Sequence, residues 1–271
     1  MTPSVLLGAV AYDPKVVTIW NGFRSWFAER DLSFDYVLYS NYERQVQDLV
    51  GGQIDVAWNS PLAWVRTRRM APRARAVAMR DTDRDLTSVV VVRADSSATS
   101  ASDLAGSTVG TGAIDSAQAT LLPLHLLGGT DVAVHRFEIG VGLHGDHVGG
   151  ERAAAEALRD GRVDAACMID ANHLLFAKEG ILPAGATRVI ARTAPYDHCN
   201  MSVIDADVEH FVEVLLGMDY GDPAVRPLLD LEGLTRWLPG RTGGYAQLEA
   251  AVDTARFYSA TGEVTAAGYR V

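Results

Sequence analysis

The sequence predicts an α/β protein built from two similar lobes, and a near-repeat is the main reason. Residues 48–57 and 157–166 each combine the end of an amphipathic helix, a glycine and a short apolar strand containing one aspartate, Asp55 or Asp164. Polar residues follow both strands, which is the second observation. Because ligands of open α/β sheets bind where the carboxyl ends of strands emerge, we expect a shared ligand cleft between the lobes.

Hydrophobic periodicity predicts the elements of the first lobe in order. Residues 5–11 and 34–39 have the composition of strands, and the apolar spacing within 16–27 is typical of a helix. A second helix runs to Val50, where glycines stop it before the first repeated strand. Pro61 is then placed to open a further helix, because proline suits the first helical position.

The second lobe begins with a run of valines. Residues 88–93 predict a strand buried on both faces, and further strands are expected within 104–110, 132–139 and 187–193, with a helix over 116–127. The region from about residue 205 is mainly helical in pattern. We therefore expect lobe one to comprise residues 1–85 plus 203–271 and lobe two residues 86–202, joined by two crossing strands that act as a hinge.

Composition limits the classes of partner. The chain has 271 residues, a formal net charge of −10 and two cysteines. The negative charge argues against nucleic acid, and two cysteines do not make a disulfide framework. No stretch approaches the ~20 apolar residues that cross a bilayer, so we expect no direct membrane insertion. No signal peptide is visible at the start, which predicts a cytoplasmic protein, or a periplasmic or extracellular one if a leader was removed.

Several motifs together resemble a known family. They are Tyr42-Glu43, the stretch from Gly52 to Trp64, residues 103–106, Asp146-His147, and residues 161–166 leading to Asp170. Over residues 5–205 their order resembles the type II periplasmic-binding-protein fold, and more narrowly the phosphate, phosphite and phosphonate solute-binding family of ABC transporters. The resemblance implies a small-molecule ligand and, for a transport component, a membrane permease as partner.

The resemblance also implies positions for the ligand contacts. They are the Tyr12 loop, the turn at Asn59 and Ser60, the helix start near Ser116, His147 and Asp170. The chain departs from the family at that helix start. A serine- and glycine-rich turn is usual there, whereas this chain has Asp115, Ser116 and Gln118. A helix start attracts anions, but Asp115 would repel a doubly charged phosphonate, which predicts a changed specificity.

Each of these residues also has a structural interpretation. Asp115 or Ser116 can be an ordinary helix cap, while Ser116 and Gln118 can also donate to a ligand. Asn59 and Ser60 suit either a plain turn or exposed backbone amides at a cleft. Asp170 either accepts from a ligand or pairs with an arginine, and Tyr196 can line the pocket. Asp55 and Asp164 are expected to cap neighbouring helices or turns instead of meeting a ligand.

The histidine and cysteine residues are candidates for ligand binding, catalysis or metal binding. His147 lies in a glycine-rich loop, and His198 and Cys199 lie in the segment that should cross back to lobe one. Imidazole suits ligand binding, acid–base chemistry and metal binding alike. No complete metal signature is present, so we predict no metal site and can name no cofactor.

Three functions therefore remain open from the sequence. The first is a solute-binding protein that closes on a small polar metabolite bearing an oxyanion or a carboxylate. The second is a cytoplasmic enzyme on the same fold, a decarboxylase, lyase or other biosynthetic enzyme with or without a metal, with His147, His198 and Cys199 as its catalytic residues. The third is a cytoplasmic ligand sensor.

Overall fold

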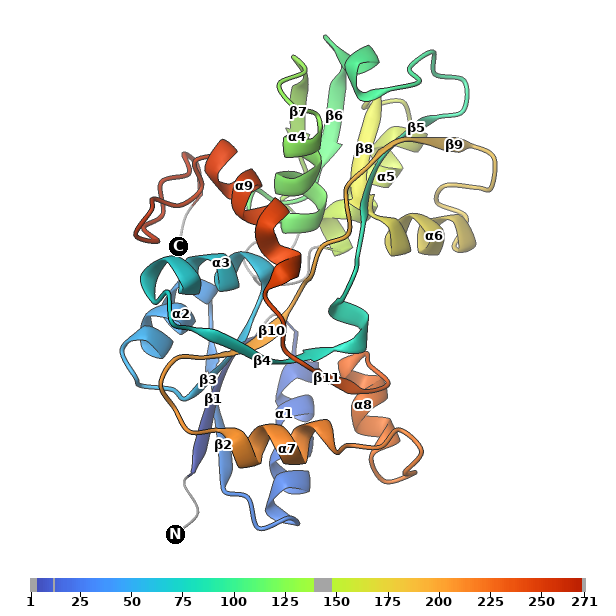
Figure 1. Ribbon diagram of the computed structural model, residues 1–271. Helices are drawn as coiled ribbons and strands as arrows, with labels where there is room; N and C mark the ends of the chain where they lie inside the picture. Colours follow the sequence, from blue (N-terminus) through green and yellow to red (C-terminus); the bar gives the residue numbers. More distant parts are fainter. Residues whose placement is uncertain (1–3, 12, 139–147, 270–271) are drawn as a thin grey trace.

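Two sheets, each covered by helices on both faces, make up the protein (Figure 1). The computed structural model describes residues 4–11, 13–138 and 148–269. The predicted site residues Tyr12 and His147, and the neighbouring His144, lie outside this range. Within it, every helix is too short or too polar to cross a lipid bilayer.

The sheet of lobe one contains six strands in the order β11-β4-β10-β3-β1-β2. Strands β1, β2 and β3 are parallel, and β10 is antiparallel to both β3 and β4. Their bounds are β1 Val5–Val10, β2 Phe34–Tyr39, β3 Val56–Asn59, β4 Arg75–Arg80, β10 Asn200–Val203 and β11 Trp237–Pro239. The sequence did not predict β11, which lies in the region expected to be mainly helical.

Helices cover both faces of this sheet because side chains alternate along each strand. Leu7 and Ala9 pack with the aromatic face of α1 and with α7 and α8, while Val10 packs with α2 and α3. The helices are α1 Lys15–Ala28, α2 Tyr42–Val50, α3 Pro61–Met70, α7 Glu209–Leu216 and α8 Arg226–Glu232. A short 3₁₀ turn, η1 (Asp81–Asp83), leads out of β4.

The sheet of lobe two has five strands in the order β7-β6-β8-β5-β9. The valines of β5 alternate between two cores, Val89 and Val91 on one face and Val90 and Val92 on the other, which confirms a strand buried on both sides. The strands are β5 Ser88–Arg93, β6 Thr108–Thr111, β7 Ala133–Arg136, β8 Ala165–Ile169 and β9 Thr187–Arg192. The helical segments are the 3₁₀ turn η2 Ala101–Leu104, the π-helix η3 Ala117–Leu121, α4 Leu122–Leu126, α5 Val148–Arg159 and α6 Asp170–Lys178.

The aspartate of the repeated motif makes the same kind of hydrogen bond in both lobes. The Asp55 carboxylate accepts from the backbone N–H of Leu6 at 2.8 Å, and the Asp164 carboxylate accepts from that of Thr108 at 2.8 Å. Each aspartate thereby ties the start of its own strand to the neighbouring parallel strand, β1 or β6. The prediction that these aspartates cap neighbouring helices or turns is therefore wrong, because each bonds to the backbone of a neighbouring strand.

Two segments cross between the sheets and lie side by side. Residues 81–87 leave β4 for β5, and residues 193–199 return from β9 to β10. Leu86 and Tyr196 exchange both backbone hydrogen bonds at 2.8 Å, and the His198 N–H donates to the Asp83 carbonyl at 2.8 Å. The prediction of a two-lobed α/β fold joined by two crossing segments is confirmed.

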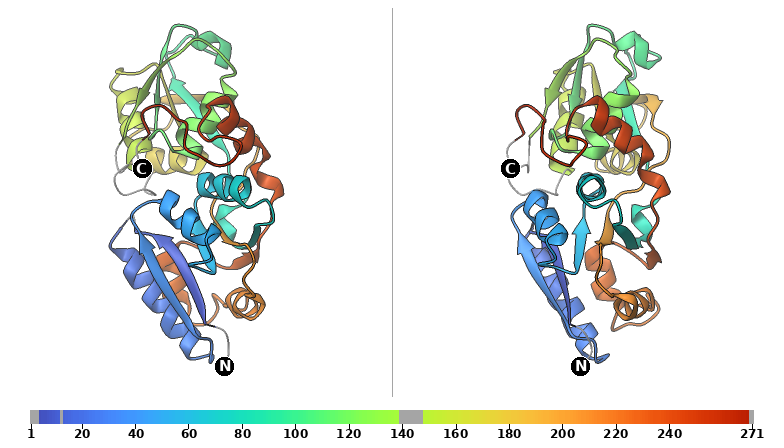
Figure 2. Two further views of the ribbon diagram at one scale, coloured as in Figure 1. Left: turned by 90° about the vertical axis from the view of Figure 1, so that its left-hand side faces the viewer. Right: turned by 60° about the vertical axis from the view of Figure 1, so that its left-hand side comes forward.

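The C-terminal region also contacts both lobes. After the short turn η5 (Gly243–Tyr245), helix α9 (Ala246–Thr254) packs on α3 of lobe one and on η3 and α4 of lobe two (Figure 2). Leu248, Val252 and Phe257 share one hydrophobic core with Leu62 and Leu121. The lobes are therefore connected by apolar packing as well as by the crossing segments.

Candidate functional site

A small cavity lies where the two lobes meet. It measures about 30 Å³, which is room for about two water molecules. The described residues that line it are Tyr42, Ser60, Pro61, Leu62, Asp115, Ala117, Gln118, His198 and Cys199. They come from α2 and α3 of lobe one, from the η3 region of lobe two and from one crossing segment. Side chains from both lobes thus approach one another closely around this cavity.

Two helices, one from each lobe, begin at this cavity. Ser60 caps α3 by accepting from the Ala63 N–H at 3.1 Å, and Ser116 caps η3 by accepting from the Ala119 N–H at 3.1 Å. Helix η3 continues directly into α4, so both helices are several turns long. Helix N-termini carry partial positive charge and unused amide donors, which favour an anion. The prediction that Ser116 is a cap is confirmed, and ligand contact by Ser60 remains a prediction.

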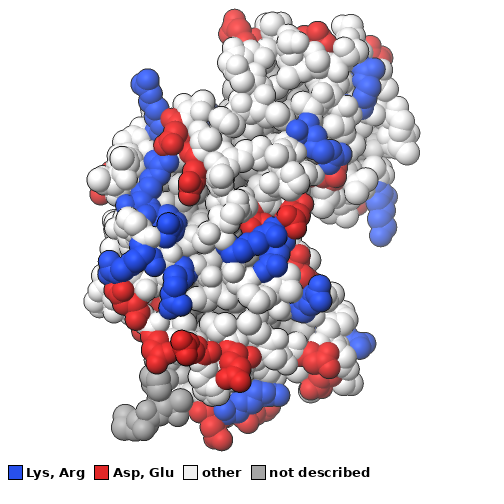
Figure 3. All heavy atoms as spheres, in the orientation of Figure 1, with Lys and Arg blue, Asp and Glu red and all other residues white. Residues whose placement is uncertain are grey.

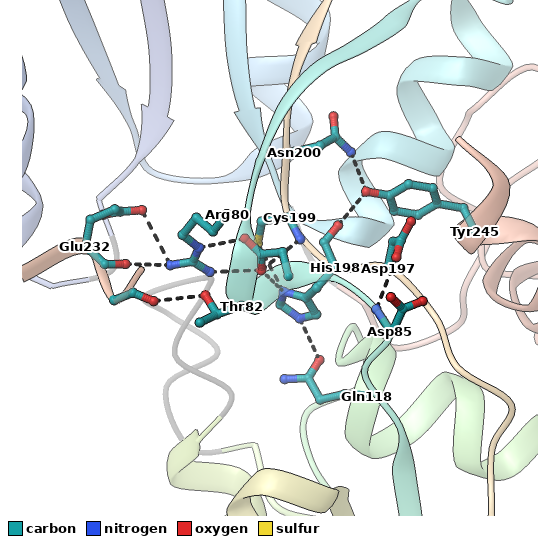
Figure 4. A network of polar contacts seen from close by, with 12 residues as sticks. Arg80, Thr82, Asp85, Gln118, Asp197, His198, Cys199, Asn200, Glu232 and Tyr245 are labelled. Atoms are coloured by element: carbon teal, nitrogen blue, oxygen red, sulfur yellow. Dashed lines mark hydrogen bonds and ion pairs between the residues drawn. The ribbon is translucent and has the colours of Figure 1, made fainter. Parts of the chain in front are cut away.

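His198 brings a titratable charge to the same cavity (Figure 4). Its Nδ1 lies 3.4 Å from Oδ1 of Asp83 and 3.2 Å from the sulfur of Cys199, and its Nε2 lies 3.4 Å from the amide oxygen of Gln118. Burial lowers the pKa of this ring, but Cys199 and Asp83 outweigh burial and raise the pKa to about 10. This shift favours the imidazolium form of His198.

Asp83 is held in place from the other side by Arg80. The guanidinium donates to both carboxylate oxygens, at 2.6 and 3.0 Å. Burial opposes ionisation of Asp83, yet Arg80 and His198 lower its pKa to about 2. Arg80 also donates to the backbone carbonyl of Glu232 at 2.8 Å, and burial raises the pKa of the Glu232 carboxyl to about 7.

This cluster resembles a metal site in composition only. The nearest ligand atoms of Asp83, His198 and Cys199 lie within 4.8 Å of one another. Both oxygens of Asp83 already accept from Arg80, however, so a metal ion would sit beside a guanidinium. The arrangement fits a hydrogen-bonded ion cluster better than a cation site.

Gln118 completes the network from lobe two. Its Nε2 donates to the carboxylate of Glu151 on α5 at 3.2 Å. Glu151 is completely buried and also accepts from the Ile169 N–H and from Asn172, both at 2.9 Å. Burial raises the pKa of Glu151, and these three donors oppose that rise.

Other predicted site residues have internal partners. Asn59 is fully buried and bonds to Gln45, Thr67 and Ser202 within lobe one. The Tyr196 hydroxyl is 2.7 Å from that of Ser88 in the crossing region, and burial raises its pKa. Asp170 pairs with Arg192 at 2.6 Å, the arginine alternative that the sequence left open. The structure brings Ser60, Asp115, Gln118, His198 and Cys199 together, while Asn59, Tyr196 and Asp170 do not line this cavity.

Sequence reasoning missed Asp83, Arg80 and Glu151. The spacing of Arg80 and Asp83, three residues apart before the valine strand, was an available signal of an ion pair. Glu151 stands in the first turn of α5, where an acidic residue is ordinary, so its buried position gave no signal.

Comparison with known proteins assigns the chain to a family. A family model described as the ABC transporter, phosphonate, periplasmic substrate-binding protein matches residues 9–243. The chain belongs to this family. The prediction of a solute-binding protein is therefore confirmed, and the enzyme alternative is not favoured. The family is described as periplasmic, so the expected cytoplasmic location is not supported.

Solved structures show the same fold at low identity. PhnD1 of Prochlorococcus marinus in complex with methylphosphonate is 18% identical with a TM-score of 0.66, covering 93% of this chain and 98% of its own. XAC2383 of Xanthomonas citri bound to ATP is 18% identical with a TM-score of 0.70 and the same coverage. The aliphatic sulphonate binding protein SsuA of Escherichia coli is 15% identical with a TM-score of 0.56, covering 94% and 87%. No curated protein matches this chain.

Proposed function

We propose that this protein closes its two lobes on a small metabolite bearing one oxyanion group and delivers it to a membrane permease of an ABC transporter. One observation carries the proposal: helix starts from opposite lobes and the cationic ring of His198 meet at a single cavity. Amide donors of both helices and the imidazolium would share the oxygens of such a ligand. Family membership supports the transport role and a periplasmic location.

The charge of the ligand is limited by Asp115, which lines the same cavity. A carboxylate a few ångströms from a bound oxyanion repels it, and the repulsion grows with the second charge of the anion. We therefore expect a monoanion, such as a sulfonate or a singly protonated phosphonate, to bind more tightly than a dianion. An acidic proton or an amine on the ligand would suit Asp115.

Family membership does not favour catalysis by His198 and Cys199. A general base needs a free nitrogen lone pair directed at the substrate, whereas both nitrogens of His198 face acceptors, Gln118 and Asp83. Cys199 contacts the same Nδ1 that faces Asp83. These contacts suit a fixed charge better than a proton shuttle.

Isothermal titration calorimetry at pH 9 tests the charge preference. We expect methanesulfonate to bind more tightly than methylphosphonate, and Asp115→Asn to strengthen methylphosphonate binding about tenfold while changing methanesulfonate binding less. Asp131→Asn, an exposed aspartate of the same lobe, is the matched control. Binding of neither oxyanion by the wild-type protein, or turnover of a bound one, would overturn the proposed function.

A further inference from the structure

Gln118 can face its neighbours in only one orientation. A carboxylate only accepts hydrogen bonds, so the Gln118 side that faces Glu151 must be its NH₂ group, 3.2 Å away. The amide oxygen is then directed at Nε2 of His198, 3.4 Å away. Nε2 must carry a proton to make this contact favourable.

The other ring nitrogen also faces an acceptor. Oδ1 of Asp83 lies 3.4 Å from Nδ1 and is held there by Arg80 and by the backbone N–H of Cys199. The sulfur of Cys199 lies 3.2 Å from the same Nδ1, where a thiol would donate to a neutral ring and a thiolate would accept from a protonated one. The Gln118 oxygen at Nε2 and the Asp83 carboxylate 3.4 Å from Nδ1 together favour the doubly protonated ring.

We propose that Glu151, although outside the cavity, is a positioning residue that sets the charge of the ligand site by orienting the Gln118 amide toward His198. This inference rests on the proposed function, because the His198 charge that Glu151 influences is the charge that would contact the oxyanion. Glu151 is fully buried and accepts from the Ile169 N–H, and its lobe contributes no cation to the described lining of the cavity.

The described charged and titratable groups around His198 come from several elements. Asp83 and Arg80 approach from the first crossing segment and β4, Cys199 from its own segment, Asp115 from the loop before η3, and Glu151 from α5. Tyr245 donates to the His198 carbonyl at 2.8 Å and leaves the ring nitrogens alone. Of these groups, Glu151 contacts the ring indirectly, through the Gln118 amide. Its effect on His198 therefore depends on how that amide is oriented.

Glu151→Gln gives a specific prediction because it has nearly the same shape. The new side chain must keep its oxygen toward the Ile169 N–H and Asn172, which both donate. Its NH₂ group then faces Gln118, the Gln118 amide turns over, and a donor confronts Nε2 of His198. The neutral ring protonated at Nδ1 becomes favoured.

The test is NMR of the ring of His198 in ¹⁵N-labelled protein without ligand, between pH 6 and 11. In Glu151→Gln we expect the pKa of His198 to fall by about one unit or more, and its neutral form to carry the proton on Nδ1. Binding of methanesulfonate, which keeps one charge over this range, should weaken at a correspondingly lower pH. Glu156→Gln, on the same helix and outside the network, should match the wild type.

A second variant separates orientation from simple loss of charge, and serves if Glu151→Gln does not fold. Gln118→Leu keeps the Glu151 charge and removes the amide, so the account predicts a fall in the pKa of His198 in this variant too. An unchanged His198 titration in either variant would overturn the proposal. Failure of the wild type to bind methanesulfonate would refute the proposed function, yet the ligand-free titration would still decide the role of Glu151.

Discussion

The two lobes are alike in their frame and unlike where they face the cavity. Asp55 and Asp164 make the same bond to the adjacent strand, and Gly52 and Gly161 both have positive φ, 69° and 70°, after equivalent helices. In the register that aligns the aspartates, however, Tyr42 of lobe one corresponds to Glu151 of lobe two. The repeat thus builds the scaffold, and the residues that differ between its copies supply the chemistry.

The same register shows how each lobe ends its repeated strand. Ser60 and Pro61 open α3 at the cavity, whereas Ile169 and Asp170 stand at these positions in lobe two. Asp170 pairs with Arg192 and takes no part in the cavity lining. Lobe two reaches the cavity instead through Asp115 and Gln118, before and within η3.

The charge distribution over the surface is mixed. On the face in Figure 3, basic and acidic side chains are interspersed, and a hollow separates the lobes at the right-hand edge. The ion cluster of Arg80, Asp83 and His198 lies in the region that joins the lobes, so it affects both of them.

The largest expected effect comes from breaking this junction. Asp83→Asn leaves Arg80 and His198 without their shared carboxylate, and we expect a loss of about 3–5 kcal/mol in the free energy of unfolding. Asp85→Asn, on the same crossing segment but exposed, is the control and should cost much less. Equal losses in urea denaturation would contradict a special role for the buried cluster.

The pH dependence of stability follows from the same pair. The pKa of Asp83 is lowered to about 2, so ionised Asp83 contributes to the free energy of unfolding. This contribution is complete above the ordinary carboxyl pKa of 3.8 and is lost as the pH falls through 2. The pKa of His198 is raised to about 10, so its contribution is complete below 6.5 and is lost as the pH rises through 10. Both contributions are complete between pH 3.8 and pH 6.5. Outside that range, we expect the free energy of unfolding of Asp83→Asn to depend less on pH than that of the wild type.

A smaller effect is expected from removing the equivalent aspartate hydrogen bonds of the two lobes. Asp55→Ala removes a partly buried charge-assisted hydrogen bond and should cost about 1.5–3 kcal/mol. Asp164→Ala removes the equivalent bond at an exposed position and should cost less, because water replaces the lost partner. Thermal unfolding of both variants gives the order, and the reverse order would contradict this account.

The smallest effect concerns the two caps. Ser60→Ala and Ser116→Ala should each cost about 1 kcal/mol, because each removes one N-cap hydrogen bond. Only Ser60 lines the cavity, while Ser116 is fully buried. We therefore expect Ser60→Ala alone to weaken methanesulfonate binding in calorimetry, and an equal effect of Ser116→Ala would show that its hydroxyl also reaches the ligand.

The two-lobed scaffold could be predicted from the sequence because its helices and strands are indicated by local patterns. Glycine stops, the valine run and the duplicated aspartates are visible in short windows, and Ser116 was identifiable as a cap. The partners of Asn59 come from α2, α3 and β10, which no local pattern connects, so its internal role was invisible. Glu151 was missed for the same reason, since its burial depends on Gln118, Asn172 and the end of β8.

Calorimetric titration of methanesulfonate into the wild-type protein between pH 6 and 11 tests the central claim most directly. The account predicts an affinity that is constant at neutral pH and falls as the pH rises through about 10, where His198 loses its charge. His198→Gln should bind more weakly and lose this dependence. No binding at neutral pH, or an affinity in the wild type that is unchanged up to pH 11, would contradict the claim that an imidazolium between the lobes holds the oxyanion.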